Sequence, residues 1–138
     1  MIVTRYLEFE TAGDNDIVDI TEETSRAVRE SGVKSGAAIV FVPGATGAVT
    51  TIEHEPGLVQ DMKAALERWA PVDLGYSHDQ RWGDGNGHSH IRASLLGPSL
   101  AIPFNEHELM LGTWQQIIFI DMDNRPRRRK IVVQIMGE

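Results

Sequence analysis

The sequence predicts a single α+β domain over residues 1–138, with mostly antiparallel β-sheets and two helices packed on them. Two observations favour this fold class: the two helix-like segments come first, and the residues after position 87 read as strands only. A chain of 138 residues is long enough for one buried core. Its 41% hydrophobic and 24% charged residues are typical of a globular protein.

The two predicted helices are marked by their end signals. The first begins near Asp19 or Thr21, either of which can cap it, and it ends at Gly32. The second begins at Pro56, because proline is favoured in a first helical turn, and it runs to Pro71. Apolar side chains recur along the second helix at helical spacing, namely Leu58, Met62, Ala65, Leu66 and Trp69.

Short apolar segments bounded by turn residues predict the strands. Consecutive apolar residues at 117–120 and 131–133 indicate that the last strands are covered on both faces. One cover is the core of the domain, and the second predicts a neighbouring subunit in a closed homo-oligomer. The predicted strands span residues 2–9, 33–42, 47–53, 88–96, 99–104, 108–111, 115–121 and 130–136.

The segment with the candidate metal-ligating residues begins with a long loop. Residues 73–87 are polar, rich in glycine and aperiodic, and loops of this length within compact domains are usually functional. After it, His88, His90 and Arg92 alternate along a predicted strand, so all three side chains would leave the same face. A His-x-His pair on a strand can present two imidazoles to one metal ion, and His78 in the loop is the predicted third ligand.

A site with three histidine ligands would leave a coordination position free for water or substrate. Asp84 is a weaker candidate for the third ligand. The chain has no cysteine, so the ligands must be His, Asp or Glu, which suit zinc or magnesium. The alternative is that these histidines are surface or hydrogen-bonded residues, because a bare His-x-His motif also occurs without a metal.

Two further charged residues are assigned to this site. Arg92 has forked donors that bind phosphate or carboxylate, which favours a phosphorylated small-molecule substrate; the alternative is an ion pair with an acid such as Asp84. Glu53 ends a predicted strand and is a candidate general base or extra ligand. For Glu55, which precedes Pro56, we expect only a favourable interaction with the helix dipole.

Charge and hydropathy exclude other partners. The net charge of −7 argues against general nucleic-acid binding. We expect the basic cluster at 125–130 to be a solvated hairpin tip, although it could instead hold a small anion or pair with acids of another subunit. No apolar run reaches the length of a membrane span, and the first residues lack a signal-peptide pattern, which predicts a cytoplasmic protein.

The chain resembles the YjbQ family, also called UPF0047, in three segments: G-D-G-N-G-H-S-H-I-R-A-S-L-L-G-P-S-L, L-G-T-W-Q-Q-I and R-R-R-K-I-V-V-Q-I-M-G-E. The likeness extends over nearly the whole chain and is strongest in its last third. It implies a small α+β domain that assembles as a homotrimer, with a histidine-lined site for a divalent metal ion. It also implies secondary thiamine-phosphate synthase activity, which joins a pyrimidine pyrophosphate to a thiazole phosphate with loss of pyrophosphate.

The resemblance also implies a set of site residues and shows two departures. In place of the histidine and threonines that are common in the family after the strand ending near Val42, this chain has Gly44-Ala45-Thr46. An asparagine-rich segment that often follows the acid is shortened to His54-Glu55-Pro56. The implied site residues are Glu53, His78, Asn86, His88, His90 and Arg92.

Together these features predict a metal-assisted enzyme that acts on a phosphorylated small molecule. His78, His88 and His90 would hold the ion, Arg92 would bind phosphate and Glu53 would handle a proton. A metal-dependent hydrolase would use the same residues. The alternatives from other classes are a non-catalytic trimer that binds a metal or small ligand, and a purely structural oligomer in which the histidines make subunit contacts.

Overall fold

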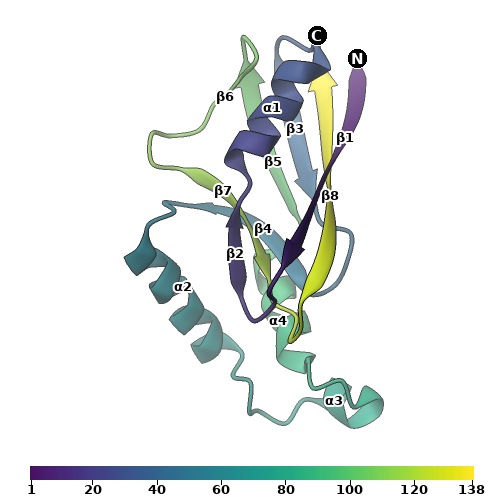
Figure 1. The fold of residues 1–138 in the computed structure, drawn as a ribbon, viewed down its shortest axis with the longest axis vertical. Coiled ribbons are helices and arrows are strands. Elements are labelled where there is room, and N and C mark those ends of the chain that lie inside the picture. Colours follow the sequence, from purple (N-terminus) through teal and green to yellow (C-terminus); the bar gives the residue numbers. More distant parts are fainter.

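The computed structural model describes residues 1–138 as an α+β fold with antiparallel strand pairs (Figure 1), which confirms the predicted fold class. The strands are β1 (Ile2–Thr11), β2 (Asp16–Asp19), β3 (Gly36–Phe41), β4 (Gly47–Ile52), β5 (Ser99–Asn105), β6 (Glu108–Leu109), β7 (Gln116–Asp121) and β8 (Arg127–Gly137). The helices are α1 (Thr21–Ser31), α2 (Pro56–Trp69), α3 (Ser77–Trp82) and α4 (Gly87–Leu96).

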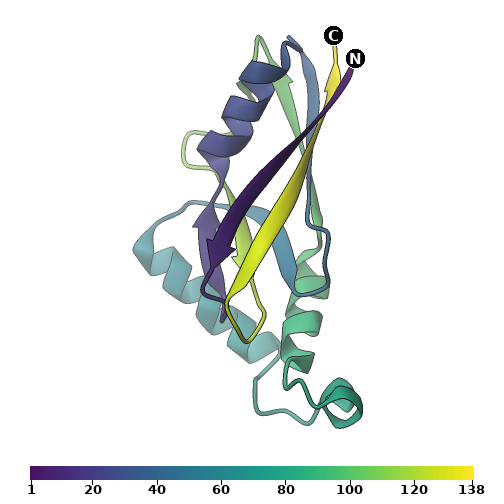
Figure 2. The ribbon, with the colours of Figure 1, turned by 45° about the vertical axis from the view of Figure 1, so that its right-hand side comes forward.

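The strands form two sheets that share a core. The larger sheet has the order β1-β8-β3-β5-β6, and the smaller has the order β2-β7-β4. Apolar side chains from both sheets meet between them, because alternate residues of each strand point inward. The fully buried members of this cluster include Val40, Val49, Ile117, Phe119 and Ile131. The long β1-β8 pair brings the two chain termini together at one end of the molecule (Figure 2).

Helix α1 covers a face of one sheet, and helices α2 and α4 cover a face of the other (Figures 1 and 2). On α1, Ala27 and Val28 are buried against the larger sheet, and this helix ends at Gly32 as predicted. On the far face of the smaller sheet, Leu66 of α2 and Ala93 of α4 pack in one apolar cluster. Burial of about 25 cal/mol for each Å² of apolar surface makes these contacts the main source of stability. None of the four helices has the length and apolar character needed to cross a membrane.

Strand β7 is covered on both faces by this chain alone. Ile117 and Phe119 face the core between the sheets, whereas Ile118 and Ile120 face the cluster beneath α2 and α4. The consecutive apolar residues therefore indicate two covers, as expected, but the second cover of β7 is a pair of helices. The expectation that a neighbouring subunit supplies it is wrong for this strand.

The segment predicted as a strand at 88–96 is the helix α4, and the preceding predicted loop contains the short helix α3. Ala93, Leu95 and Leu96 are strong helix formers, and this segment has only one β-branched residue, Ile91. At its start, a Cβ atom on Gly87 would lie 2.5 Å from the Cβ of Tyr76, so only glycine allows this close approach. The period-2 pattern of polar residues was therefore a misleading signal.

Candidate functional site

The helical conformation of α4 separates the residues that a strand would have united. In a helix, residues four apart share a face and residues two apart do not. His88 and Arg92 accordingly lie together and are buried, with 4% and 3% of their surfaces exposed, whereas His90 is half-buried. The predicted common face of two imidazoles and one guanidinium is not formed.

His90 instead meets His78 of α3. Their ring centroids are 4.4 Å apart with an interplanar angle of 45°, and the buried Nδ1 of His78 has no hydrogen-bond partner. The backbone N–H of Gly87 donates to Oδ1 of Asp79 at 2.8 Å, which fixes α3 against the start of α4. This contact explains why the two rings lie side by side.

Both imidazoles line a cavity of about 460 Å³, which we call the histidine pocket. Only two of its lining residues are hydrophobic. The pocket also contains the Gly44-Ala45-Thr46 segment in which this chain departs from the resemblance. The lining residues are Gly44, Ala45, Thr46, His78, Trp82, Asp84, Asn86, His90, Arg127 and Arg129.

The residues present do not fit the expected three-histidine metal site. His88 lies away from the histidine pocket, beside Tyr76, with ring centroids 6.4 Å apart. No group of three or more His, Asp or Glu side chains is placed to hold a metal ion. Protein metal sites of the zinc type use at least three protein ligands, and here only two imidazoles come together.

Arg92 has a structural partner in place of a phosphate. Its Nε donates to the carbonyl oxygen of Ala70 at 2.9 Å, and its Nη2 donates to Oε2 of Glu67 at 2.6 Å. The guanidinium therefore joins the end of α2 to α4 and does not line the histidine pocket. The alternative of an ion pair with an acid is correct in kind, although the acid is Glu67 and Asp84 is not involved.

His88 is held neutral by its surroundings. Burial lowers the pKa of this imidazole, and the positive charge of Arg92 lowers it further. Its Nδ1 has no hydrogen-bond partner, and its Nε2 lies 3.4 Å from Oγ of Ser89. A buried, neutral imidazole beside a guanidinium is suited to packing between helices.

The two glutamates after β4 are both exposed. Glu53 does not line the histidine pocket, so the structure does not bring this predicted base to the other site residues. The Glu55 carboxylate accepts hydrogen bonds from the backbone N–H groups of Gly57 and Leu58, at 2.7 and 2.9 Å. These bonds lower the pKa of Glu55. Glu55 therefore caps α2, as the expected favourable interaction with this helix end requires.

Asn86 lies in the pocket, as the resemblance implies. It precedes α4 and is 7% exposed. Its Nδ2 donates to Oδ1 of Asp123 at 3.3 Å, while its Oδ1 is buried without any partner. This acceptor is left without a donor in the fold, and an unsatisfied buried polar group costs about 1–3 kcal/mol.

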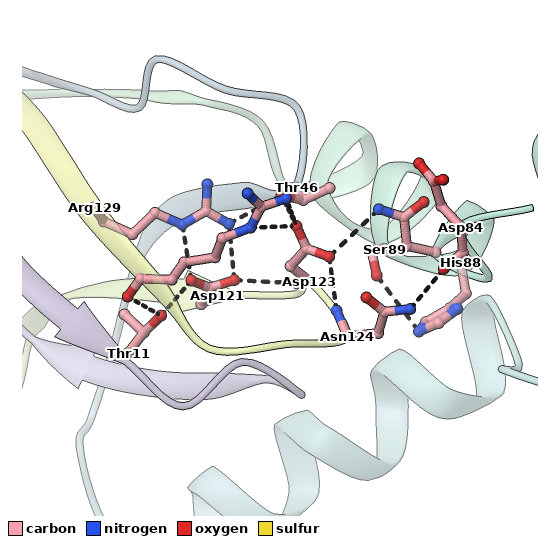
Figure 3. Close-up of polar contacts among 11 residues, drawn as sticks. Thr11, Thr46, Asp84, His88, Ser89, Asp121, Asp123, Asn124 and Arg129 are labelled. Atoms are coloured by element: carbon pink, nitrogen blue, oxygen red, sulfur yellow. Dashed lines mark hydrogen bonds and ion pairs between the residues drawn. The ribbon is translucent and has the colours of Figure 1, made fainter. Parts of the chain in front are cut away.

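The basic side of the pocket comes from β8, where the sequence predicted a solvated hairpin tip. Figure 3 shows Arg129 against the carboxylate of Asp121: Nε and Nη2 donate to its two oxygens at 2.7 and 2.8 Å. Nη2 of Arg129 also donates to Oγ1 of Thr46 at 2.9 Å. In the same way, Nε and Nη2 of Arg127 donate to Oδ2 of Asp123 at 2.9 and 2.7 Å.

Both carboxylates are fully buried. Burial alone would raise the pKa of Asp123, but the hydrogen bond from Arg127 and further bonds from Asn124, Asn86 and Thr46 lower it to about 2. Asp123 is thus a permanent anion that holds the hairpin in one conformation. The charge of each buried Asp is matched by one arginine, and neither Arg127 nor Arg129 is a solvated tip residue.

Each of these arginines keeps one nitrogen free of the buried carboxylates. Nη1 of Arg129 lies 3.4 Å from where a Cβ atom on Gly44 would be, so it points to the backbone segment that lines the pocket. The sequence placed these two residues in the basic cluster at 125–130, for which a solvated hairpin tip was preferred over a small-anion site. The signal that could have found them is the alternation of Arg127, Arg128 and Arg129 along a strand, which places the first and third on the same face.

The YjbQ-like UPF0047 protein family matches residues 5–138. The chain belongs to this family. It is 36% identical over 130 residues to a UPF0047 protein of Archaeoglobus fulgidus, covering 94% of this chain and 98% of that protein. It is 32% identical over 133 residues to the UPF0047 protein YugU of Bacillus subtilis, covering 95% and 97%.

Solved structures of the family have the same fold. A YbjQ-like protein of unknown function from Sulfolobus solfataricus P2 is similar with a TM-score of 0.90, at 30% identity and over 100% of both chains. An uncharacterized member from Clostridium acetobutylicum has a TM-score of 0.87 at 38% identity, over 96% of this chain and 99% of that one. The UPF0047 assignment from the three sequence segments is therefore confirmed.

The family does not support the predicted activity. Its matched members are described as UPF0047 proteins or as proteins of unknown function, and none is named as a thiamine-phosphate synthase or a metal enzyme. The prediction of a metal-assisted, synthase-like enzyme was therefore wrong. The geometry agrees with this correction, because Arg92 and His88 lie away from the pocket that holds His78 and His90.

Proposed function

We propose that the histidine pocket binds a small molecule through a phosphate or a similar oxyanion. The observation that carries this proposal is the pair of arginines, Arg127 and Arg129, each fixed by a buried carboxylate and each lining the pocket. A guanidinium has five N–H donors, and its free donors match the oxygens of phosphate or carboxylate.

Preorganisation favours binding at this place. A flexible arginine loses rotamer freedom when it binds a ligand, at a cost of about 0.5–1.5 kcal/mol for each such side chain. Arg129 is already held by three hydrogen bonds and its side chain is only 10% exposed. The entropy cost of ordering Arg129 is therefore incurred when the protein folds. Less of this cost then reduces the affinity for a ligand.

The opposite groups of the pocket supply further donors. Ring nitrogens of His78 and His90 can donate to an oxyanion. Asp84 is the one acid that lines the pocket, and it is exposed. Asp121 and Asp123 already accept hydrogen bonds from Nε and Nη2 of the arginines, so the donors left for an incoming anion include Nη1 of Arg127 and of Arg129.

Calorimetric titration with inorganic phosphate tests the proposal. We expect the native protein to bind phosphate and His90→Gln to bind it about tenfold more weakly, which corresponds to about 1.4 kcal/mol. The His90 side chain makes no hydrogen bond within the fold, so this variant should remain folded. A second variant, Arg127→Gln, should weaken binding at least as much.

Arg128→Gln is the matched control for the arginine variant. Arg128 lies on the same strand with its side chain 63% exposed, 3.8 Å or more from Glu8 and Glu10, and it does not line the pocket. It should leave phosphate affinity unchanged. Absence of phosphate binding by the native protein, or equal losses in Arg127→Gln and Arg128→Gln, would refute the proposal.

One surface supports the homotrimer that the resemblance implies. On the outer face of the larger sheet, Tyr6, Val132 and Phe41 are cross-strand neighbours, and Tyr6 and Phe41 are 55% and 40% exposed. Exposed contiguous apolar side chains are typical of protein interfaces. Sedimentation velocity would test this proposal, with Tyr6→Glu expected to yield monomers; a native monomer would contradict it.

The pocket gives little support for a bound divalent ion, zinc or magnesium. Two imidazoles are its only support here, since the structure places no third ligand beside them. Metal analysis of the purified protein would decide it, and the proposed anion binding does not depend on the result.

A further inference from the structure

A second pocket adjoins the histidine pocket on its hairpin side. It has a volume of about 190 Å³ and is lined by polar residues alone, and we call it the hairpin pocket. Three of its five lining residues also line the histidine pocket. These shared residues are Asp84, Asn86 and Arg127; the other two are Asn124 and Arg125.

The hairpin pocket is held in shape by a network that Figure 3 shows around Asp123 and Asn124. The side-chain Nδ2 of Asn124 donates to the carbonyl oxygen of Asp84 at 2.9 Å, and its backbone N–H donates to Oδ1 of Asp123 at 2.8 Å. The turn between β7 and β8 is thereby fixed to the connection between α3 and α4. Two segments about 40 residues apart in sequence form one wall.

Asn86 lines both pockets and presents an acceptor. Its amide orientation is set, because reversing it would place Oδ1 against the carboxylate of Asp123 and would remove the hydrogen bond at 3.3 Å. No protein group donates to Oδ1, so this oxygen is available to accept a hydrogen bond from a ligand hydroxyl or amine.

Arg125 supplies a positive charge that the fold does not use. Its guanidinium takes part in none of the ion pairs of the structure, although it lines the hairpin pocket. The fold-building arginines of this hairpin, Arg127 and Arg129, are by contrast paired with buried carboxylates. An uncommitted guanidinium in a small polar pocket is suited to a second anionic group.

We infer that the two pockets act as two subsites for one ligand, which carries two anionic groups with a hydrogen-bond donor between them. This inference rests on the proposed function and specifies its ligand class. The phosphate occupies the larger histidine pocket, and a carboxylate or second phosphate meets Arg125 in the hairpin pocket. Arg127, which lines both pockets, contacts both groups, and Asn86 accepts the hydrogen bond from the hydroxyl or amine between them.

The test compares three phosphate compounds of similar length by calorimetric titration. Glycerol 3-phosphate has one anionic group, 3-phosphoglycerate adds a carboxylate, and 3-phosphooxypropionate has the carboxylate without the hydroxyl. We expect the native protein to bind 3-phosphoglycerate at least about tenfold more tightly than glycerol 3-phosphate, as one added charge-assisted hydrogen bond would provide. Its affinity for 3-phosphooxypropionate should be intermediate.

Arg125→Gln should reduce the preference for 3-phosphoglycerate over glycerol 3-phosphate to about twofold. Arg128→Gln, the matched control on the same hairpin, should retain the full preference. Equal native affinity for glycerol 3-phosphate and 3-phosphoglycerate would overturn the inference and leave phosphate binding intact. A preference that Arg125→Gln does not reduce would overturn it as well. Absence of binding of all phosphate compounds would instead refute the proposed function.

Discussion

Residues 83–92 and the hairpin of β7 and β8 both carry basic side chains at every second position. The first segment forms a helix and the second forms a strand, so these side chains are placed differently. On α4, His88 and His90 point to different sides, and only His90 lines the pocket. On β8, Arg127 and Arg129 share a face and both line it. The same sequence spacing therefore separates side chains on a helix and unites them on a strand.

The two regions also differ in how deeply the acidic partners of their arginines are buried. The hairpin arginines are held by fully buried Asp121 and Asp123, whereas Arg92 of α4 is held by half-exposed Glu67 and a carbonyl oxygen. We expect the hairpin to be the more costly region to disrupt. The predictions below separate the two regions by stability, by binding and by pH.

The largest loss of unfolding free energy is expected from Asp121→Ala. This change leaves Arg129 without its bidentate partner and removes the acceptor for Oγ1 of Thr11. Breaking a buried ion pair from one side costs about 3–5 kcal/mol, which should appear as a loss of unfolding free energy in urea denaturation. Arg128→Ala, on the exposed face, should cost less than about 1 kcal/mol. Similar losses in both variants would show that the hairpin network is not the stabilising feature.

Arg92→Met should cost less, about 2 kcal/mol, because the variant loses hydrogen bonds to Ala70 and Glu67 but keeps an apolar stem in a buried place. Its phosphate affinity should equal that of the native protein, since Arg92 does not line the histidine pocket. Urea denaturation and calorimetric titration of one preparation measure both quantities. Weaker phosphate binding by a folded Arg92→Met protein would show that Arg92 takes part in phosphate binding.

Much of the fold could be predicted where a local sequence signal, such as a helix-end residue or a regular apolar spacing, is strong. The α1 and α2 helices have end signals and apolar spacing, and they lie close to the predicted segments. The apolar residues of β7 correctly indicated two covered faces. The short strand β2 (Asp16–Asp19) is absent from the predicted strands, and its last residue, Asp19, was a predicted start of the first helix.

The site was predicted only in part, because long-range contacts decide it. The pocket contains His78, His90 and Asn86 as expected, but it excludes Glu53, His88 and Arg92. Packing of Ala93 against Ile118 and Ile120, and the approach of Gly87 to Tyr76, favour the helix α4. No local pattern reveals these contacts. The partners of Arg127 and Arg129 depend in turn on where the buried carboxylates lie.

A histidine inside the histidine pocket and one outside it should differ in their smaller effect on phosphate binding. His78→Gln should weaken phosphate binding about fivefold, because it removes a ring that lines the histidine pocket. His88→Gln should leave the affinity unchanged, since His88 lies outside that pocket. Titration of both variants with inorganic phosphate measures this difference. A larger loss in His88→Gln than in His78→Gln would show that His88, and not His78, contacts the bound phosphate.

The smallest effect is a pH dependence of stability that comes from His88. Burial and the charge of Arg92 lower its pKa in the folded protein, so the unfolded chain binds a proton at higher pH than the folded one. Its contribution to stability is therefore complete above the unfolded pKa of about 6.5 and is lost as the pH falls toward the lower folded pKa. Urea denaturation between about pH 5 and pH 8 should show this decline, and His88→Gln should flatten it. An unchanged slope in the variant would mean that another group, outside the buried face of α4, titrates on unfolding.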